Sequence, residues 1–224
     1  MVMQDAHTAF ADYCEAIFEL HEDDLEVIQA RIAERLDISR PAVSEMIRRM
    51  ANEGLVTVDG SIQLTASGME LAERVVRRHR LAERFLTDVL GLNWAEAHHE
   101  AGRWEHVLSD KVELAMNRIL GAPTTCPHGN PIPGSAYTEP EMVTLTEVEL
   151  GADFSVTRIP EELEFAPGVL EFLEENQVKP GMVGHLTAAS PDGTVTLNIE
   201  GRHVGIGPFA ARRILVTLGA VVLA

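Results

Sequence analysis

Apolar side chains recur every three to four positions through the first half of the chain, which predicts amphipathic helices there. Over Asp5–Leu20 the pattern includes Phe10, Tyr13 and Ile17, so a first helix is expected in this stretch. From Met142 the pattern changes to alternating or continuous apolar runs, which favour strands. The pattern therefore predicts a helical N-terminal part and a β-rich C-terminal part.

Two short helices and a hairpin are expected after the first helix. VIQARIAERL predicts an amphipathic helix, and after the tight turn DIS the side chain of Ser39 can cap the next one. Pro41 fits the first turn of that second helix, which is expected to end at Gly54. LVTVDGSIQLT then predicts two strands that turn at Asp59-Gly60. A helix-turn-helix followed by a hairpin is a winged helix.

The second helix of this unit presents a polar face suited to DNA. Its outward positions are expected to be Ser39, Arg40, Pro41, Ala42, Ser44, Glu45, Arg48 and Arg49. Arg31, Arg48 and Arg49 are expected to contact phosphate, because guanidinium groups bind it well. Ser39, Pro41 and Glu45 are expected to approach base edges. A helical hairpin without a DNA role is the alternative, but the order of Ser/Pro start, arginine pair and wing favours DNA binding.

Two longer helices are expected next. Thr65 caps a helix that runs to about Leu90, the sequence GLN breaks it, and a second helix is expected over Trp94–Leu120. This second helix carries more apolar surface than one helical partner can cover, at Trp104, Val107, Leu108 and Leu114. A homodimer interface is therefore expected here, with packing inside one chain as the alternative.

A Pro/Gly-rich segment, APTTCPHGNPIPGSAYTEP, separates these helices from the β-rich part and is not expected to form regular structure. Within it, Cys126 and His128 place a thiol and an imidazole on irregular backbone, a pair that suits a metal better than a core. Strands are expected in VTLTEVEL, FSVTRI, MVGHLTAA, TVTLNI, HVGIG and ILVTL, with short helices at PGVLEFLEENQ and Gly207–Arg213. Together they predict a small β-barrel of SH3-like size.

Composition narrows the classes of function. The chain has 224 residues, 46% of them hydrophobic, which is enough for a sizeable core in two or three small domains. No apolar run is long enough for a membrane span, and the acidic, amphipathic N-terminus does not resemble a signal peptide. A cytoplasmic protein without a membrane partner is therefore expected. Cys14 and Cys126 are too few for a disulfide framework.

The charge is unevenly distributed along the chain. A net charge of −17 argues against indiscriminate nucleic-acid binding. Residues 27–49 nevertheless hold five arginines against three acids, whereas residues 139–175 hold eleven acids against one arginine. A locally basic segment in an acidic protein suits DNA binding that has to be switched on.

Histidines and carboxylates on the two longer helices form a pattern typical of a divalent-metal site. Each residue turns a helix by about 100°, so four positions fall within about 100° of arc: His98, Gly102, Glu105 and His106. His79 and Glu83 lie at i and i+4 on the earlier helix and also share a face. Each of these residues alone is typical of an ordinary helix surface. Five of them on matching faces favour a metal-binding site.

The sequence predicts a winged helix, then two helices that carry potential metal ligands, and then a small barrel. With these parts in this order, the chain resembles the diphtheria-toxin-repressor family of metal-dependent transcriptional repressors. The motifs RIAERL, PAVS, RHRLAER, RWEHVLSD and GNPIPG carry the resemblance, which covers all 224 residues and is closest over His79–Gly134. It implies an α+β chain with a winged helix-turn-helix domain (1–73), a helical metal-binding and dimerisation domain (74–140) and an SH3-like domain (141–224). It also implies a homodimer that binds two or more divalent ions per chain and, when loaded, a palindromic double-stranded DNA operator.

The resemblance also implies a set of ligands. At a primary site it implies Glu105 and His106, with Asp12 and Glu15 as in the manganese-sensing branch. At an ancillary site it implies His79, Glu83, His98, Cys126, His128, Glu161 and Glu164. Gly102 stands where the iron-sensing branch has a cysteine and the manganese-sensing branch a glutamate. A water or another side chain must therefore replace that ligand.

The expected metal is Mn²⁺. Asp12 replaces a thioether of the iron-sensing branch by a carboxylate, and oxygen ligands favour Mn²⁺ over Fe²⁺. An Fe²⁺-sensing repressor is the alternative within the same family. No enzyme activity is expected, because no hydrolytic motif such as HExxH is present and a metalloenzyme would leave the winged helix unexplained. A third interpretation is a regulator that senses an organic ligand, with structural histidines, but no such ligand is expected.

Overall fold

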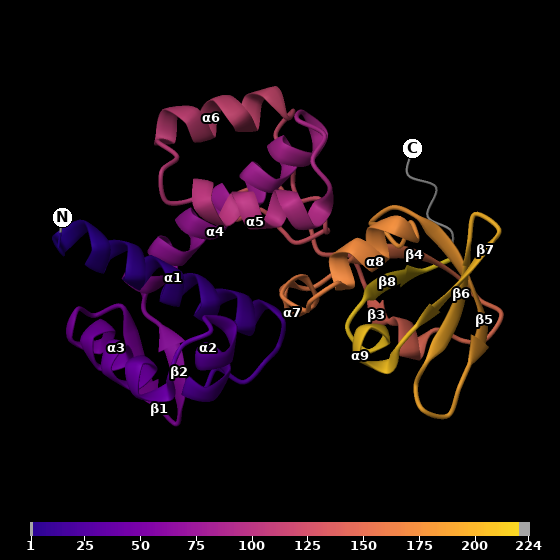
Figure 1. The fold of residues 1–224 in the computed structure, drawn as a ribbon, viewed down its shortest axis with the longest axis horizontal. Coiled ribbons are helices and arrows are strands. Elements are labelled where there is room, and N and C mark those ends of the chain that lie inside the picture. The colour runs from indigo at the N-terminus through magenta and orange to yellow at the C-terminus, as the bar shows by residue number, and fades with distance from the viewer. Residues whose placement is uncertain (1, 220–224) are drawn as a thin grey trace.

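Three lobes make up the part of the chain that the computed structural model describes, residues 2–219 (Figure 1). The N-terminal lobe contains α1 (Val2–Glu22), α2 (Gln29–Arg35), α3 (Arg40–Asn52), β1 (Val56–Asp59) and β2 (Ser61–Leu64). The helical lobe contains α4 (Ala66–Asp88), α5 (Trp94–Trp104) and α6 (Asp110–Ile119). The C-terminal lobe contains β3 (Val143–Thr144), a 3₁₀-helix (Leu145–Glu147), β4 (Asp153–Arg158), α7 (Glu161–Glu164), α8 (Val169–Glu175), β5 (Val183–Ala189), β6 (Val195–Ile199), β7 (Arg202–Ile206), α9 (Pro208–Ala211) and β8 (Leu215–Leu218). Within residues 2–219, no helix has the length and apolar character needed to cross a membrane.

The N-terminal lobe is the winged helix that the sequence predicts. Ser39 caps α3 by accepting a hydrogen bond from the Ala42 N–H at 3.4 Å, and Pro41 lies in the first turn. The inward positions of α3 are buried in a core shared with α1 and the hairpin: Val43, Ile47 and Met50. β1 and β2 pair antiparallel on either side of Gly60, which has a positive φ of 73°.

The wing is joined closely to α4. Thr65 Oγ1 accepts a hydrogen bond from the Gly68 N–H at 3.2 Å and donates one to the Gly54 carbonyl at 2.6 Å. A Cβ at Gly68 would overlap the carbonyl oxygen of Leu55, so this close approach requires glycine. Helix α4 then continues without a break through the expected domain boundary between residues 73 and 74. The winged helix and the helical lobe are therefore coupled by one continuous helix.

The prediction of a single helix over Trp94–Leu120 is wrong, because the chain forms α5 and α6 with a turn between them. Ser109 caps α6 by accepting a hydrogen bond from the Val112 N–H at 3.4 Å. Ser109 followed by an aspartate is an N-cap signal inside the expected helix. The break places Glu105 and His106 in the turn after α5, so a common helical face does not explain their position.

The C-terminal lobe is a six-stranded antiparallel sheet in the order β3-β8-β4-β5-β6-β7. Its core is contiguous and includes Phe154, Leu186 and Leu197. The strand expected in VTLTEVEL is much shorter, because only its first two residues pair with β8. The Glu147 side chain accepts a hydrogen bond from the Thr144 N–H at 2.8 Å and turns the chain into the 3₁₀-helix.

A wholly buried arginine joins the three lobes. Arg80 lies on α4 and is 0% exposed. Its Nη2 lies 2.6 Å from Oε2 of Glu22, at the end of α1, and 3.0 Å from Oε1 of Glu161, at the start of α7. Its Nη1 donates a hydrogen bond to the Pro131 carbonyl at 2.5 Å. Because a buried guanidinium needs charged partners, Arg80 holds α1 and α7 against α4.

A second joint, made of hydrogen bonds to acidic side chains, connects the N-terminal and C-terminal lobes directly. Arg158 Nη2 lies 2.8 Å from Asp23 Oδ1 and 3.1 Å from Glu22 Oε2. The Glu162 backbone N–H donates a hydrogen bond to Asp23 Oδ2 at 3.1 Å. The loop after α1 is thus fixed to β4 and α7, although these segments are far apart in the sequence.

Arg80→Ala should reduce stability severely, because it leaves the buried Glu161 without its charged partner and Glu22 with Arg158 alone. We expect a loss of about 3–5 kcal/mol in the free energy of unfolding, measured by urea denaturation of the metal-free protein. Arg48→Ala removes an exposed arginine that pairs with Glu45 and should cost less than about 1 kcal/mol. Equal losses in the two variants would contradict the joining role of Arg80.

Asp23→Asn should flatten the pH dependence of stability in the metal-free protein. Burial raises the pKa of Asp23 to about 7, and Arg158 offsets this effect only in part. A carboxyl whose pKa is raised on folding contributes stability that is complete below its unfolded pKa of about 4 and is lost as the pH rises through 7.

Between pH 5 and 7 the wild type should therefore lose about 2 kcal/mol of unfolding free energy through Asp23, and Asp23→Asn should not. Urea denaturation across this range measures the difference. Asp88→Asn changes an exposed carboxylate at the end of α4 and serves as the control. Parallel pH profiles in all three proteins would mean that Asp23 stays ionised.

Candidate metal centre

Imidazole and carboxylate groups from all three lobes line a cavity of about 530 Å³. They come from α1, α4, α5 with the turn after it, and α7. Among the lining residues are Asp12, Glu15, His79, His98, His99, Gly102, Glu105, His106 and Glu164. The cavity is therefore built only when the lobes are packed as they are here.

The first cluster contains the side chains expected at the primary site. Glu15, His79 and Glu105 each offer a ligand atom within 4.8 Å of the others. His79 Nδ1 lies 2.5 Å from Glu105 Oε2. His106 Nε2 lies 3.0 Å from Asp12 Oδ1 and 3.1 Å from Glu105 Oε1. The Glu105 carboxylate thus lies between two imidazoles, and one of them, His79, belongs to the set expected at the ancillary site.

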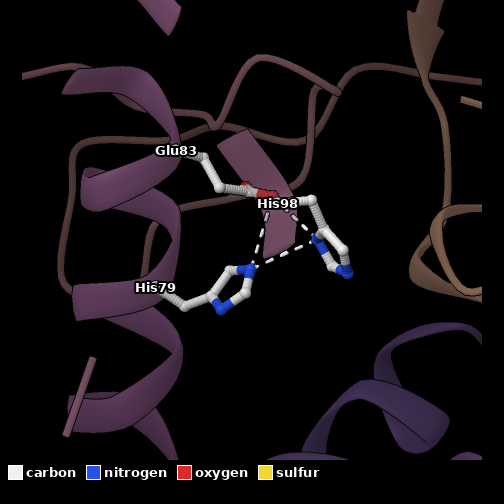
Figure 2. A group of neighbouring side chains, drawn as sticks. All are labelled: His79, Glu83 and His98. Atoms are coloured by element: carbon white, nitrogen blue, oxygen red, sulfur yellow. Dashed lines mark hydrogen bonds and ion pairs between the residues drawn. The ribbon is translucent and has the colours of Figure 1, made fainter. Parts of the chain in front are cut away.

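The second cluster lies on the other side of the His79 ring. Figure 2 shows His79, Glu83 and His98 pointing toward one another, the first two from α4 and the third from α5. His79 Nε2 lies 3.3 Å from Glu83 Oε1 and 3.3 Å from His98 Nδ1. His98 Nδ1 lies 3.0 Å from Glu83 Oε1. Three ligand atoms therefore converge on one point.

The Cys-Pro-His segment meets this cluster from the loop after α6. Cys126, His128 and Glu83 form a third group of potential ligands, and all three side chains are buried. His128 Nδ1 lies 2.8 Å from Glu164 Oε2 and 3.5 Å from Glu83 Oε1. Cys126 Sγ lies 3.8 Å from His128 Nδ1. Glu83 is thus shared by the second and third groups.

Both carboxylates expected from the C-terminal lobe reach the site through α7. Glu164 Oε2 lies 3.1 Å from His98 Nδ1, and Glu161 falls in the same group of potential ligands. Glu161 is also the partner of Arg80, so one of its oxygens is already engaged. The two acids therefore have different surroundings, although both are buried.

Asn130 holds Glu164 in place, a role that sequence reasoning misses. Its Nδ2 donates a hydrogen bond to Glu164 Oε1 at 2.6 Å. Its Oδ1 accepts one from Arg158 Nε at 2.6 Å. The motif GNPIPG marks the segment, but no spacing rule links Asn130 to an acid 34 positions later. Partners of this kind orient ligands and tune a metal site.

Gly102 lines the cavity without offering a side chain. It is exposed on α5, and a Cβ built there would meet no atom within 4 Å. The position is therefore not restricted to glycine by packing or by backbone conformation. The space that a side-chain ligand would fill is open.

Burial opposes the ionisation of carboxyl groups that lie close together at the site. Burial, followed by the neighbouring carboxylate of Glu105, raises the pKa of Glu15 well above its ordinary value. Burial and Glu164 also raise the pKa of Glu161. A divalent cation would relieve both the repulsion and the loss of hydration.

Several buried ligand atoms have no hydrogen-bond partner among the described residues. They are Glu15 Oε1, Glu83 Oε2, Glu161 Oε2 and His128 Nε2. Leaving such an atom unpaired costs about 1–3 kcal/mol, so each of them needs another partner. Carboxylate oxygens and imidazole nitrogens are good ligands for divalent transition metals. The residues present therefore fit one or more divalent ions.

The residues expected to contact DNA lie away from these clusters, on α2 and α3. Most of the expected face is exposed: Ser39, Arg40, Pro41, Ala42, Glu45, Arg48 and Arg49. Ser44 and Arg31 are half-buried. Arg48 Nη2 pairs with Glu45 Oε2 at 2.6 Å, and both side chains face solvent. This polar face is available to a partner.

The apolar residues expected at a dimer interface are divided between two environments. Trp104 and Leu108 pack against the small core of the helical lobe, as the alternative interpretation proposed. Val107 and Leu114 are 78% and 64% exposed, and Ile119 on α6 is 64% exposed. The outer side of α6 therefore presents apolar surface that packing within the chain does not cover.

Comparison with known proteins gives two matches to protein-family models. Residues 7–61 match the N-terminal DNA-binding domain of iron-dependent repressors. Residues 65–134 match their metal-binding and dimerisation domain. The boundary between the two matches lies at the wing, close to where α4 begins.

Individual relatives extend this likeness over most of the chain. The iron-dependent repressor IdeR of Mycobacterium tuberculosis is 41% identical over 205 residues, which are 85% of this chain and 88% of the relative. The diphtheria toxin repressor of Corynebacterium diphtheriae is 48% identical over 134 residues, 59% of each chain. A solved structure of a manganese-dependent transcriptional repressor in complex with manganese is 33% identical, covers 94% of this chain and 100% of its own, and has a TM-score of 0.85.

Sequence relatives and structural neighbours thus include both iron-dependent and manganese-dependent repressors. The structure of the manganese regulator SloR, 30% identical with a TM-score of 0.74, also covers 94% of this chain and 98% of its own. The resemblance seen in the sequence motifs is confirmed, as is the fold of winged helix, helical dimerisation domain and C-terminal β-sheet domain. The chain belongs to the diphtheria-toxin-repressor family of metal-dependent transcriptional repressors.

Proposed function

We propose that this repressor senses Mn²⁺ and, as a metal-loaded homodimer, binds a palindromic operator in genes of metal homeostasis. The observation that supports Mn²⁺ is the position of Asp12, whose carboxylate lies 3.0 Å from His106 Nε2 at the primary cluster. Asp12, Glu15, Glu105 and His106 give a set of oxygen and nitrogen ligands without sulfur, which favours Mn²⁺ over softer metals.

The ancillary site is proposed around Glu83. Its proposed ligands are His79, Glu83, His98, Cys126, His128, Glu161 and Glu164. With the primary site, this arrangement would hold two or more divalent ions per chain. The expected domains fit this division: the helical domain (74–140) supplies most of the ligands, and the SH3-like domain (141–224) adds the two acids of α7. The winged-helix domain (1–73) contributes Asp12 and Glu15 to the primary site.

Metal binding is proposed to act on DNA binding through α1. Asp12 and Glu15 lie on this helix, whose other face packs in the core of the winged helix through Tyr13 and Ile17. Their partners, His79 and the residues after α5, belong to the helical lobe. A shared cation removes the repulsion between these carboxylates and so fixes the winged helix relative to the dimerisation helices.

In a dimer this restraint sets the distance between two recognition helices near one turn of DNA, about 34 Å. A coupling of about 1–3 kcal/mol would change operator affinity by about 5–150-fold. The exposed face of α3 carries the residues proposed to meet DNA, with Arg31, Arg48 and Arg49 on phosphate and Ser39, Pro41 and Glu45 near bases.

An Fe²⁺-sensing repressor is the second candidate. The relatives matched by sequence over 205 residues are named iron-dependent repressors, which supports it. Any divalent ion later in the affinity series binds such ligands at least as tightly as Mn²⁺, so geometry and availability decide between the metals.

The experiment that separates the two candidates is a titration of operator binding with each metal. DNA selected from a random library by the protein loaded with either ion serves as the operator, and fluorescence anisotropy measures binding by the chelated dimer under anaerobic conditions. We expect Mn²⁺ to activate at the lower free concentration, and Asp12→Met to weaken activation by Mn²⁺ more than by Fe²⁺.

Asp88→Met, at the exposed end of α4, should leave both titrations unchanged. Activation by Fe²⁺ at the lower free concentration would establish the second candidate. Operator binding that ignores both metals and chelators would contradict a metal switch and favour a regulator with another ligand.

Arg48→Ala should weaken binding to operator and non-operator DNA alike, because a phosphate contact carries no sequence information. The slope of log K against log salt should become shallower by about 1, the contribution of one phosphate contact. Arg202→Ala, on β7 of the C-terminal lobe, is the control. An unchanged slope would place Arg48 outside the DNA contact.

A further inference from the structure

We propose that His99 supplies the primary metal site with the ligand that position 102 does not provide. This inference rests on the proposed function, since it concerns how that site is completed. It assigns a metal-binding role to a histidine outside the ligand set described above.

The first argument is the gap at Gly102. The glycine lies at the cavity beside Glu105 and His106, and a Cβ there would meet no atom within 4 Å. Packing does not exclude a side chain at this position, and its φ is not in the left-handed region. The absence of a side chain therefore leaves a clear path from the cavity to the neighbouring turn of α5.

The second argument is the placement of His99. On α5, residue 99 precedes residue 102 by one turn and lies on the same side of the helix, because three residues turn it by about 300°. His99 lines the same cavity as Asp12, Glu105 and His106. Its side chain is exposed, so a change of rotamer toward the cavity displaces no core residue.

The third argument is the state of the ring nitrogen. His99 Nε2 lies 2.9 Å from Nη2 of Arg103, and a guanidinium can only donate a hydrogen bond. Nε2 is therefore the unprotonated nitrogen, and the lone pair with which it accepts this hydrogen bond is the one that would bind a metal once the bond to Arg103 is released.

Releasing His99 would not leave Arg103 without a partner. Arg103 Nη1 lies 2.6 Å from Glu100 Oε1, and both side chains reach solvent. The movement that brings His99 to the metal therefore breaks one exposed hydrogen bond, which is worth little in water. The gain is an imidazole ligand in place of a bound water.

The test compares the wild-type dimer with His99→Ala and a matched control, His185→Ala, which removes a histidine paired with Asp153 in the C-terminal lobe. Mn²⁺ alone is the probe. Calorimetry measures its affinity, and pulsed electron paramagnetic resonance counts the nitrogens coupled to each bound ion. His99→Ala should lose one coupled nitrogen and weaken the primary site at least about tenfold, and His185→Ala should do neither.

A second variant distinguishes a missing ligand from a damaged helix. Adding Gly102→Glu to His99→Ala restores a side-chain ligand at the open position and should recover affinity without restoring the lost nitrogen signal. Unchanged affinity and an unchanged nitrogen count in His99→Ala would overturn the proposal, as would the absence of any Mn²⁺ binding by the wild type. Operator binding is measured separately, so Mn²⁺ that binds without activating would contradict the proposed function alone.

Discussion

The structure depends on one buried positive charge. Arg80 has no contact with water, and the interior can hold it only because Glu22 and Glu161 neutralise it. These two acids end α1 and begin α7, so neutralising Arg80 fixes the N-terminal and C-terminal lobes on the helical lobe. The same two elements carry Asp12, Glu15 and Glu164 to the histidines of α4 and α5. The geometry of the candidate metal centre therefore depends on the neighbouring ion pairs of Arg80 with Glu22 and Glu161.

Acids outnumber bases in this interior, and the excess defines what the site can bind. The carboxyls of Glu15 and Glu161 have raised pKa values because burial and neighbouring acids oppose their ionisation. Several buried oxygens and one imidazole nitrogen also have no partner among the described residues. A divalent ion would answer both needs at once. Stability and metal loading are thus linked in one small region.

Sequence reasoning predicted the parts whose signals are local. Ser39, Pro41 and the Asp59-Gly60 turn determine the winged helix, and the spacing of His79 and Glu83 places both on one face of α4. It failed where a local signal was overlooked, as at the Ser109 cap that divides α5 from α6. It could not find contacts between distant segments, such as Asn130 with Glu164 or Arg158 with Asp23, because no periodicity connects them. The family resemblance implied a set of ligands, but it gave no sign of the residues that hold those side chains in place.

The ring of His79 has a consequence for the order in which the ions enter. Its Nδ1 faces Glu105, and its Nε2 faces Glu83 and His98. A neutral imidazole has a single lone pair, so it can serve as a ligand on one side and must act as a hydrogen-bond donor on the other. An ion that bound His79 first would fix the tautomer and leave the other side of the ring as a hydrogen-bond donor. The order of binding would thus decide which of the two proposed sites has this imidazole as a ligand.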